Sequence, residues 1–153
     1  MATMIFAWVA VGDVVLSVAV VSAAAFFNPW VVGLVAVAAF ASLERACCMW
    51  IDLHWAEWSA REHDRLERRI EQWRHGGVMS RVVGWISGAS ASRYTIAAVL
   101  TSPTMVVAIG RMMTGEPVGR HKVDRACVAY GLILGGLMTF IGWALTMLPG
   151  VGR

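Results

Sequence analysis

Apolar positions dominate the first 49 residues of the chain, and the turn signal among them is Asn28-Pro29-Trp30. On either side of this turn lie apolar stretches of about 20 residues, each long enough as a helix to cross a hydrocarbon core about 30 Å thick. The pattern therefore predicts a transmembrane hairpin over residues 1–50, with spans from about Met4 to Phe27 and from Trp30 to about Trp50.

The pattern changes sharply after Trp50, where charged residues appear at nearly every helical turn as far as His75. Trp55, Leu66, Ile70 and Trp73 recur at helical spacing, and Gly76-Gly77 is a typical C-terminal signal. Residues 51–77 are predicted to form a polar cytoplasmic helix that continues the second span without a break. Its narrow apolar edge, formed by the four residues above, is a candidate contact for a partner or for the membrane surface.

Residues 78–92 alternate apolar and polar positions in a way that predicts a short helix lying in the membrane interface. Residues 94–148 are predicted to form a second transmembrane hairpin, whose final span begins near Arg125 and whose polar loop ends at Asp124. The first half of this hairpin, Tyr94 to Gly110, is interrupted at its centre by Thr101-Ser102-Pro103-Thr104. It either crosses the membrane or dips into it and returns at the interruption.

Composition supports a membrane protein, because 58% hydrophobic residues exceeds the roughly 45–50% apolar content of soluble domains. The fold class predicted is an all-α polytopic membrane protein, a single domain over residues 1–153 with four transmembrane helices. The larger arginine cluster, between Arg61 and Arg93, should lie in the cytoplasm, which places both termini there. Twelve arginines against one lysine hint at a GC-rich genome and hence at a bacterial plasma membrane.

Charged residues inside the first hairpin are the first candidates for function, since burying an acid at the centre of a span costs about 2.5–3.5 kcal/mol. Asp13 lies 15 residues before Asn28, and Glu44 and Arg45 lie 15 and 16 residues after Pro29. In an antiparallel hairpin the three side chains are level. The favoured interpretation is an ion pair between Asp13 and Arg45 that locks the hairpin, and the alternative is proton or cation handling by Asp13 and Glu44.

Small residues on the last span form a second candidate feature. Steps of three and four residues place them on one helical face, where they let another backbone approach closely. They are Gly131, Gly135, Thr139, Gly142 and Thr146. The partner of this stripe is another span of the same chain, a second protomer or a foreign subunit.

Motifs for catalysis and for cofactors are missing from the sequence. Cys47 and His54 could share a helical face, but the further ligands of a metal site follow no recognisable spacing. The segment from Glu57 to Arg74 carries five acids and five arginines, and this balance argues against nucleic acid as a partner.

The sequence thus predicts a non-catalytic membrane subunit without metal or cofactor. Its partners would be membrane lipid and either further copies of itself or other membrane subunits. The alternative function is an oligomeric channel or transporter that uses Asp13 and Glu44.

Overall fold

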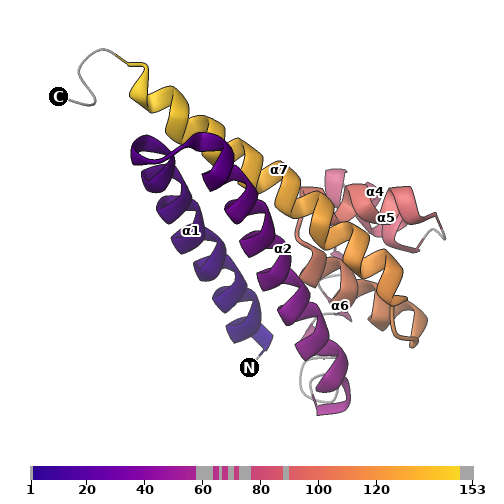
Figure 1. Cartoon of the computed structure of the whole chain (residues 1–153). Coiled ribbons are helices and arrows are strands. Elements are labelled where there is room, and N and C mark those ends of the chain that lie inside the picture. The colour runs from indigo at the N-terminus through magenta and orange to yellow at the C-terminus, as the bar shows by residue number, and fades with distance from the viewer. Residues whose placement is uncertain are drawn as a thin grey trace.

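The protein is described by a computed structural model that covers residues 2–57, 64–65, 67–68, 71–72, 77–87 and 90–148. Within these residues every regular element is a helix: α1 (Ala2–Phe26), α2 (Pro29–Leu53), α4 (Gly77–Ser87), α5 (Ala91–Leu100), α6 (Pro103–Thr114) and α7 (Arg120–Thr146). Figure 1 shows α1, α2 and α7 as long neighbouring helices, with α4, α5 and α6 gathered at one end.

The turn between α1 and α2 lies where the sequence places it. The side chain of Asn28 caps α2 by accepting a hydrogen bond from the Trp30 amide at 3.0 Å, and Pro29 occupies the first helical turn. Proline is favoured there because its fixed φ suits a helix and it lacks an amide hydrogen that would need a partner. The residues on both sides therefore fold as an antiparallel helical hairpin.

The second helix ends earlier than predicted, at Leu53. The ring of His54 stacks on Trp50 with centroids 4.4 Å apart, and its Nδ1 atom lies 3.0 Å from the Trp50 carbonyl oxygen. Residues 55–57 are helical again after this break. The prediction of one unbroken helix through this segment is therefore wrong. The side chain and the backbone of the cap residue, His54, provide hydrogen-bond partners at the last turn of α2, so the helix can end there.

Tyr94 to Gly110, the segment predicted to be the third span, is not one helix. It is divided between α5, of 10 residues, and α6, of 12 residues. Ser102 ends the break by accepting a hydrogen bond from the Met105 amide at 3.1 Å, and Pro103 begins α6. Neither helix reaches the roughly 20 residues that a crossing requires.

Three helices in the described part of the chain are long and apolar enough to cross a membrane: Ala7–Phe26 within α1, Pro29–Leu53 and Arg120–Thr146. The last of them starts at Arg120, five residues before the predicted start, because Gly119 and not Asp124 provides its N-cap. The protein is therefore an all-helical chain with three candidate spans, and the predicted fourth span is not seen.

The direction of α7 follows from the residues that it meets. A Cβ atom added to Gly131 would lie 2.6 Å from the carbonyl oxygen of Val37, and one added to Gly142 would lie 2.5 Å from that of Val21. Position 131 thus meets the middle of α2, and position 142 meets the later part of α1. Helix α7 runs parallel to α1 and antiparallel to α2, and it ends beside the turn between them (Figure 1).

The most enclosed part of the molecule lies where α5 and α6 pack against α2 and α7. Residues 103–110 of α6 are buried except for Met105, which is partly buried, and Cys48 and Ile51 of α2 and Cys127 of α7 lie in the same core. Helix α4 adds Ile86 to the same core. This packing covers the irregular backbone between α5 and α6 with protein, which is the condition for such backbone at membrane depth.

Candidate functional site

Glu44 is the most deeply placed charged residue among the described side chains, with an exposed fraction of 0%. Its Oε2 atom accepts hydrogen bonds from the Thr104 amide at 3.0 Å and from the Thr104 hydroxyl at 2.6 Å. Thr104 lies in the first turn of α6, where free amide groups and the helix dipole favour an anion. Glu44 on α2 therefore acts as a cap for a helix some 60 residues later in the chain.

Asp13 bonds to α7 and not to its predicted partner. Its Oδ2 atom accepts a hydrogen bond from the Tyr130 hydroxyl at 2.8 Å. Arg45 instead pairs with Asp124, its Nε atom 2.9 Å from the carboxylate, and both side chains are about half exposed, at 58% and 47%. The predicted ion pair between Asp13 and Arg45 is therefore wrong, although the three residues lie at the level that counting from the turn indicates.

The reason for this error is the third helix. Counting residues outward from the Asn28-Pro29 turn compares only α1 with α2. Helix α7 lies against both of these helices and contributes further polar side chains that can bond to them. Tyr130 and Asp124 lie on α7 six residues apart and meet Asp13 and Arg45 separately. The Tyr130 hydroxyl donates to one oxygen of the acid without bringing a second charge beside it, while Arg45 is balanced by the opposite charge of Asp124.

A second charged pair joins α2 to α6. The guanidinium of Arg111 donates to the carboxylate of Asp52, and it also donates to the Asp52 carbonyl oxygen at 3.3 Å. The same guanidinium lies 4.9 Å from the centre of the Trp55 ring, a cation–π geometry. Trp55, one of the predicted partner contacts, is thus engaged within its own chain, and Leu66, Ile70 and Trp73 lie outside the described residues.

The stripe of small residues on α7 lies mostly against α1 and α2 of the same chain. Gly131, Gly135, Thr139 and Gly142 are buried, whereas Thr146 is exposed. A Cβ atom on Gly135 would lie 2.8 Å from the Val37 amide nitrogen, closer than real side chains approach a backbone. The glycines are what allow α7 to pack at this distance, which is the expected effect of small residues between membrane helices.

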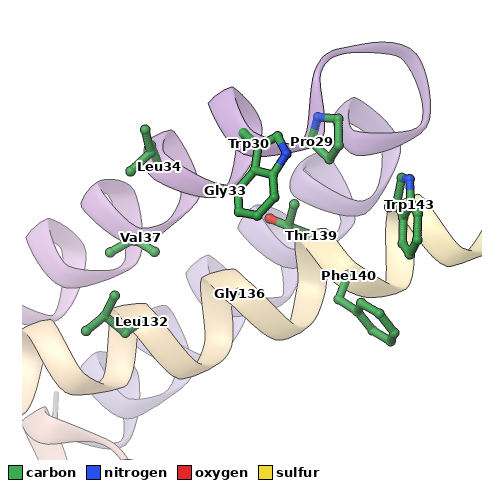
Figure 2. A pocket seen from close by; sticks show the side chains of 10 residues that line it. All are labelled: Pro29, Trp30, Gly33, Leu34, Val37, Leu132, Gly136, Thr139, Phe140 and Trp143. Atoms are coloured by element: carbon green, nitrogen blue, oxygen red, sulfur yellow. The ribbon is translucent and has the colours of Figure 1, made fainter.

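An apolar groove remains open on the outer side of the contact between α2 and α7. Its volume is about 540 Å³, and its lining consists of Pro29, Trp30, Gly33, Leu34, Val37, Leu132, Gly136, Thr139, Phe140 and Trp143. Figure 2 shows Trp30 and Trp143 at the end of the groove that lies beside the α1–α2 turn, with Val37 and Leu132 farther along α2 and α7. A Cβ atom added to Gly136 would meet nothing within 4 Å, so the floor of the groove is open at this residue.

Thr104 was noted in the sequence as part of the interruption at Thr101-Ser102-Pro103-Thr104, whose last three residues are a typical helix start after a break. The other residues of these contacts were not singled out as site residues: Tyr130, Asp124, Asp52 and Arg111. They gain their roles from helices that are distant in sequence. Among the described residues, no group of three or more His, Cys, Asp or Glu side chains could hold a metal ion.

The fold and these contacts define a class: a small all-helical protein with three candidate membrane spans and polar bonds between helices in its interior. A comparison with known protein families, with curated proteins and with solved structures finds no match to this chain.

Proposed function

We propose that this protein is a non-catalytic membrane subunit that acts by packing its helices against further helices, in a homo-oligomer or in a larger complex. The observation that carries the proposal is the open groove between α2 and α7, whose floor contains Gly33 and Gly136. Glycine in a helix interior costs about 1 kcal/mol relative to alanine. Contact with lipid chains does not require a glycine, whereas close approach of another transmembrane helix does require small residues at the contact.

The occupant that we propose for the groove is a helix of a second copy of this chain. Asp13 and Glu44 bond to other helices of the same chain, and the hydroxyls of Thr139 and Thr146 donate to carbonyl groups of their own helix, so the outer surface offers a neighbour mainly apolar contacts. Large exposed apolar residues occur on all three spans, among them Trp8, Val14, Leu34, Leu132 and Phe140. Packing of such side chains over a glycine floor is the usual way in which membrane helices associate.

Intact mass of the full chain, purified in a mild detergent, tests the subunit role directly. A homo-oligomer supports packing between copies, and co-purified foreign subunits support a role in a larger complex. A chain that stays monomeric in native lipid nanodiscs as well as in detergent contradicts the proposal.

Replacing Gly136 by leucine is expected to weaken the homo-oligomer without unfolding the protomer. The new side chain extends into the groove, where a Cβ atom at this position meets nothing within 4 Å in its own chain. We expect the dissociation constant of the oligomer to rise about tenfold, or 1.4 kcal/mol, in a detergent dilution series. Gly84→Leu is the matched control, because a Cβ atom at this α4 residue also meets nothing within 4 Å, and an equal effect of both variants would contradict the groove as the contact.

The proposed topology has three crossings, with α5 and α6 dipping into the membrane from the cytoplasmic side and α4 lying at that interface. Under this arrangement Arg93, Arg111 and Arg120 all face the cytoplasm, in keeping with the positive-inside rule. Helix α1 begins on the cytoplasmic side of the membrane. Helix α7 runs parallel to α1 and therefore ends on the non-cytoplasmic side. The membrane that we propose is a bacterial plasma membrane.

A reporter fused to the C-terminus is therefore expected to lie outside the cytoplasm, and one inserted in the loop after Gly115 is expected to lie inside. Alkaline phosphatase, active only outside, and a fluorescent protein that matures only inside give opposite readings at the two positions. A C-terminal reporter found in the cytoplasm would contradict the three crossings and favour the four-span arrangement with both termini in the cytoplasm.

A channel or carrier that uses Asp13 and Glu44 is the second candidate function. The observation that favours it is that one oxygen of each carboxylate, Asp13 Oδ1 and Glu44 Oε1, is buried without a hydrogen-bond partner. Asp13→Asn separates the two roles. Intact assembly with lost ion flux in proteoliposomes supports a pathway, and lost assembly supports a structural role.

A further inference from the structure

The two acids of the membrane interior lie level with each other on adjacent helices. Gly12 and Leu43, their neighbours in sequence, are in contact, since a Cβ atom on Gly12 would lie 3.1 Å from Leu43 Cδ2. Glu44 lies six residues before Trp50, about 9 Å along the helix, and therefore well inside the apolar part of α2. Asp13 and Glu44, each one residue further along its helix, therefore lie on neighbouring parts of α1 and α2.

The hydrogen bonds to these acids leave half of each carboxylate unsatisfied. Thr104 donates twice to Glu44 Oε2, and Tyr130 donates to Asp13 Oδ2. Glu44 Oε1 and Asp13 Oδ1 have no partner, and Glu44 is fully buried. All these donors are neutral hydroxyl or amide groups, and the arginine nearest in sequence, Arg45, pairs with Asp124.

The titratable groups around Glu44 do not supply a positive charge either. They are Asp13 on α1, Cys47 and Cys48 on α2, and Tyr130 on α7, while α6 contributes the uncharged hydroxyl of Thr104. A buried carboxylate without a counter-charge is unstable unless a cation or a proton joins it. Among the described side chains, the two acids therefore have neutral hydrogen-bond donors and one unpartnered oxygen each.

We propose that Asp13 and Glu44 form a membrane-embedded binding site for one monovalent cation, a proton or an alkali ion such as Na⁺. Free oxygens of two carboxylates, with threonine and tyrosine hydroxyls close by, form a hard oxygen donor set. A divalent ion such as Ca²⁺ takes six to eight oxygens, whereas only Asp13 Oδ1 and Glu44 Oε1 are without a partner here. The break between α5 and α6 beside Glu44 resembles the interrupted helices that form ion sites in transporters.

Reaction of the full chain with dicyclohexylcarbodiimide tests the site, because this apolar reagent enters membranes and modifies protonated carboxyl groups. Modification of Glu44 is followed by peptide mass spectrometry in phospholipid vesicles, in NaCl and in N-methylglucamine chloride, over a series of pH values. A bound Na⁺ slows the reaction about tenfold at a concentration ten times its dissociation constant. A bound proton makes the reaction fall as the pH rises, with no difference between the two salts.

Protection by Na⁺, or a pH curve of Glu44 that differs from that of the exposed acid Glu57, supports the site and identifies the cation, whereas a Glu44 that shows no Na⁺ protection and follows the same pH curve as Glu57 overturns it. Glu57 is the reference acid, because it is exposed and lies beyond the end of α2. In the Glu44→Gln variant the modification of this peptide should be lost, which verifies that the label is on the Glu44 side chain.

Asp13→Asn tests whether the two carboxylates share the cation. The asparagine keeps an oxygen that can accept from Tyr130 but removes the charge. We expect the Na⁺ protection of Glu44 to fall about tenfold, or the midpoint of the pH curve to move by about one unit. An unchanged curve in a folded variant would overturn the paired site. The labelling measurements do not depend on the mass of the oligomer. They can therefore contradict the cation site while the subunit role stands, and the intact mass can contradict the subunit role while the cation site stands.

Discussion

Gly142→Ala is expected to destabilise the protein by about 1–3 kcal/mol, the usual cost of overpacking a close contact. A Cβ atom at this position would lie 2.5 Å from the Val21 carbonyl oxygen and 2.8 Å from the Ala24 Cβ atom. The first obstacle is backbone and cannot rotate away, so α7 must move off α1. The measurement is equilibrium unfolding in mixed micelles, followed by circular dichroism and by the fluorescence of the eight tryptophans.

The matched control for this prediction is Gly136→Ala on the same helix. A Cβ atom there meets nothing within 4 Å, and alanine is favoured over glycine in a helix by about 1 kcal/mol. The control should therefore be neutral or stabilising. Equal effects of the two substitutions would mean that helix propensity, and not the contact between α7 and α1, controls stability.

Thr104→Val is expected to cost about 1.5–3 kcal/mol, since it removes a hydrogen bond to a buried carboxylate. Valine is close to threonine in shape, so the core around α6 keeps its packing, and the Thr104 amide remains as the other donor to Glu44. The loss should be visible in the same unfolding experiment. It should also weaken the attachment of α6 to α2, seen as faster hydrogen exchange in α6.

Thr139→Val provides the comparison for the loss of a hydroxyl at a buried position. The Thr139 hydroxyl donates to the Gly135 carbonyl oxygen of its own helix at 2.8 Å, and removing such a bond has little effect on a helix. We therefore expect a much smaller change than for Thr104→Val. If both variants lose the same stability, the bond between Glu44 and Thr104 does not hold α6 in place.

The sequence by itself determined the presence of apolar helices long enough to cross a membrane, and it determined the first hairpin. Apolar runs of this length have few other uses, and Asn28-Pro29 is a local signal whose effect depends only on neighbouring residues, which is why α2 begins at Pro29. The spacing of glycines on the last span likewise indicated close packing of a helix, because that pattern depends on one helix alone.

Tertiary structure alone decided the partners of the polar groups and the contacts that hold the segment after Ser90 in place. Counting along a hairpin placed Asp13, Glu44 and Arg45 level, but it could not include Tyr130 or Asp124, which α7 brings from more than 75 residues away. The apolar content of Tyr94 to Gly110 resembled a span, yet Ser102 and Pro103 start a new helix there. The amide groups exposed by this break are tolerated inside the fold because Glu44, from a helix distant in sequence, accepts a hydrogen bond from one of them.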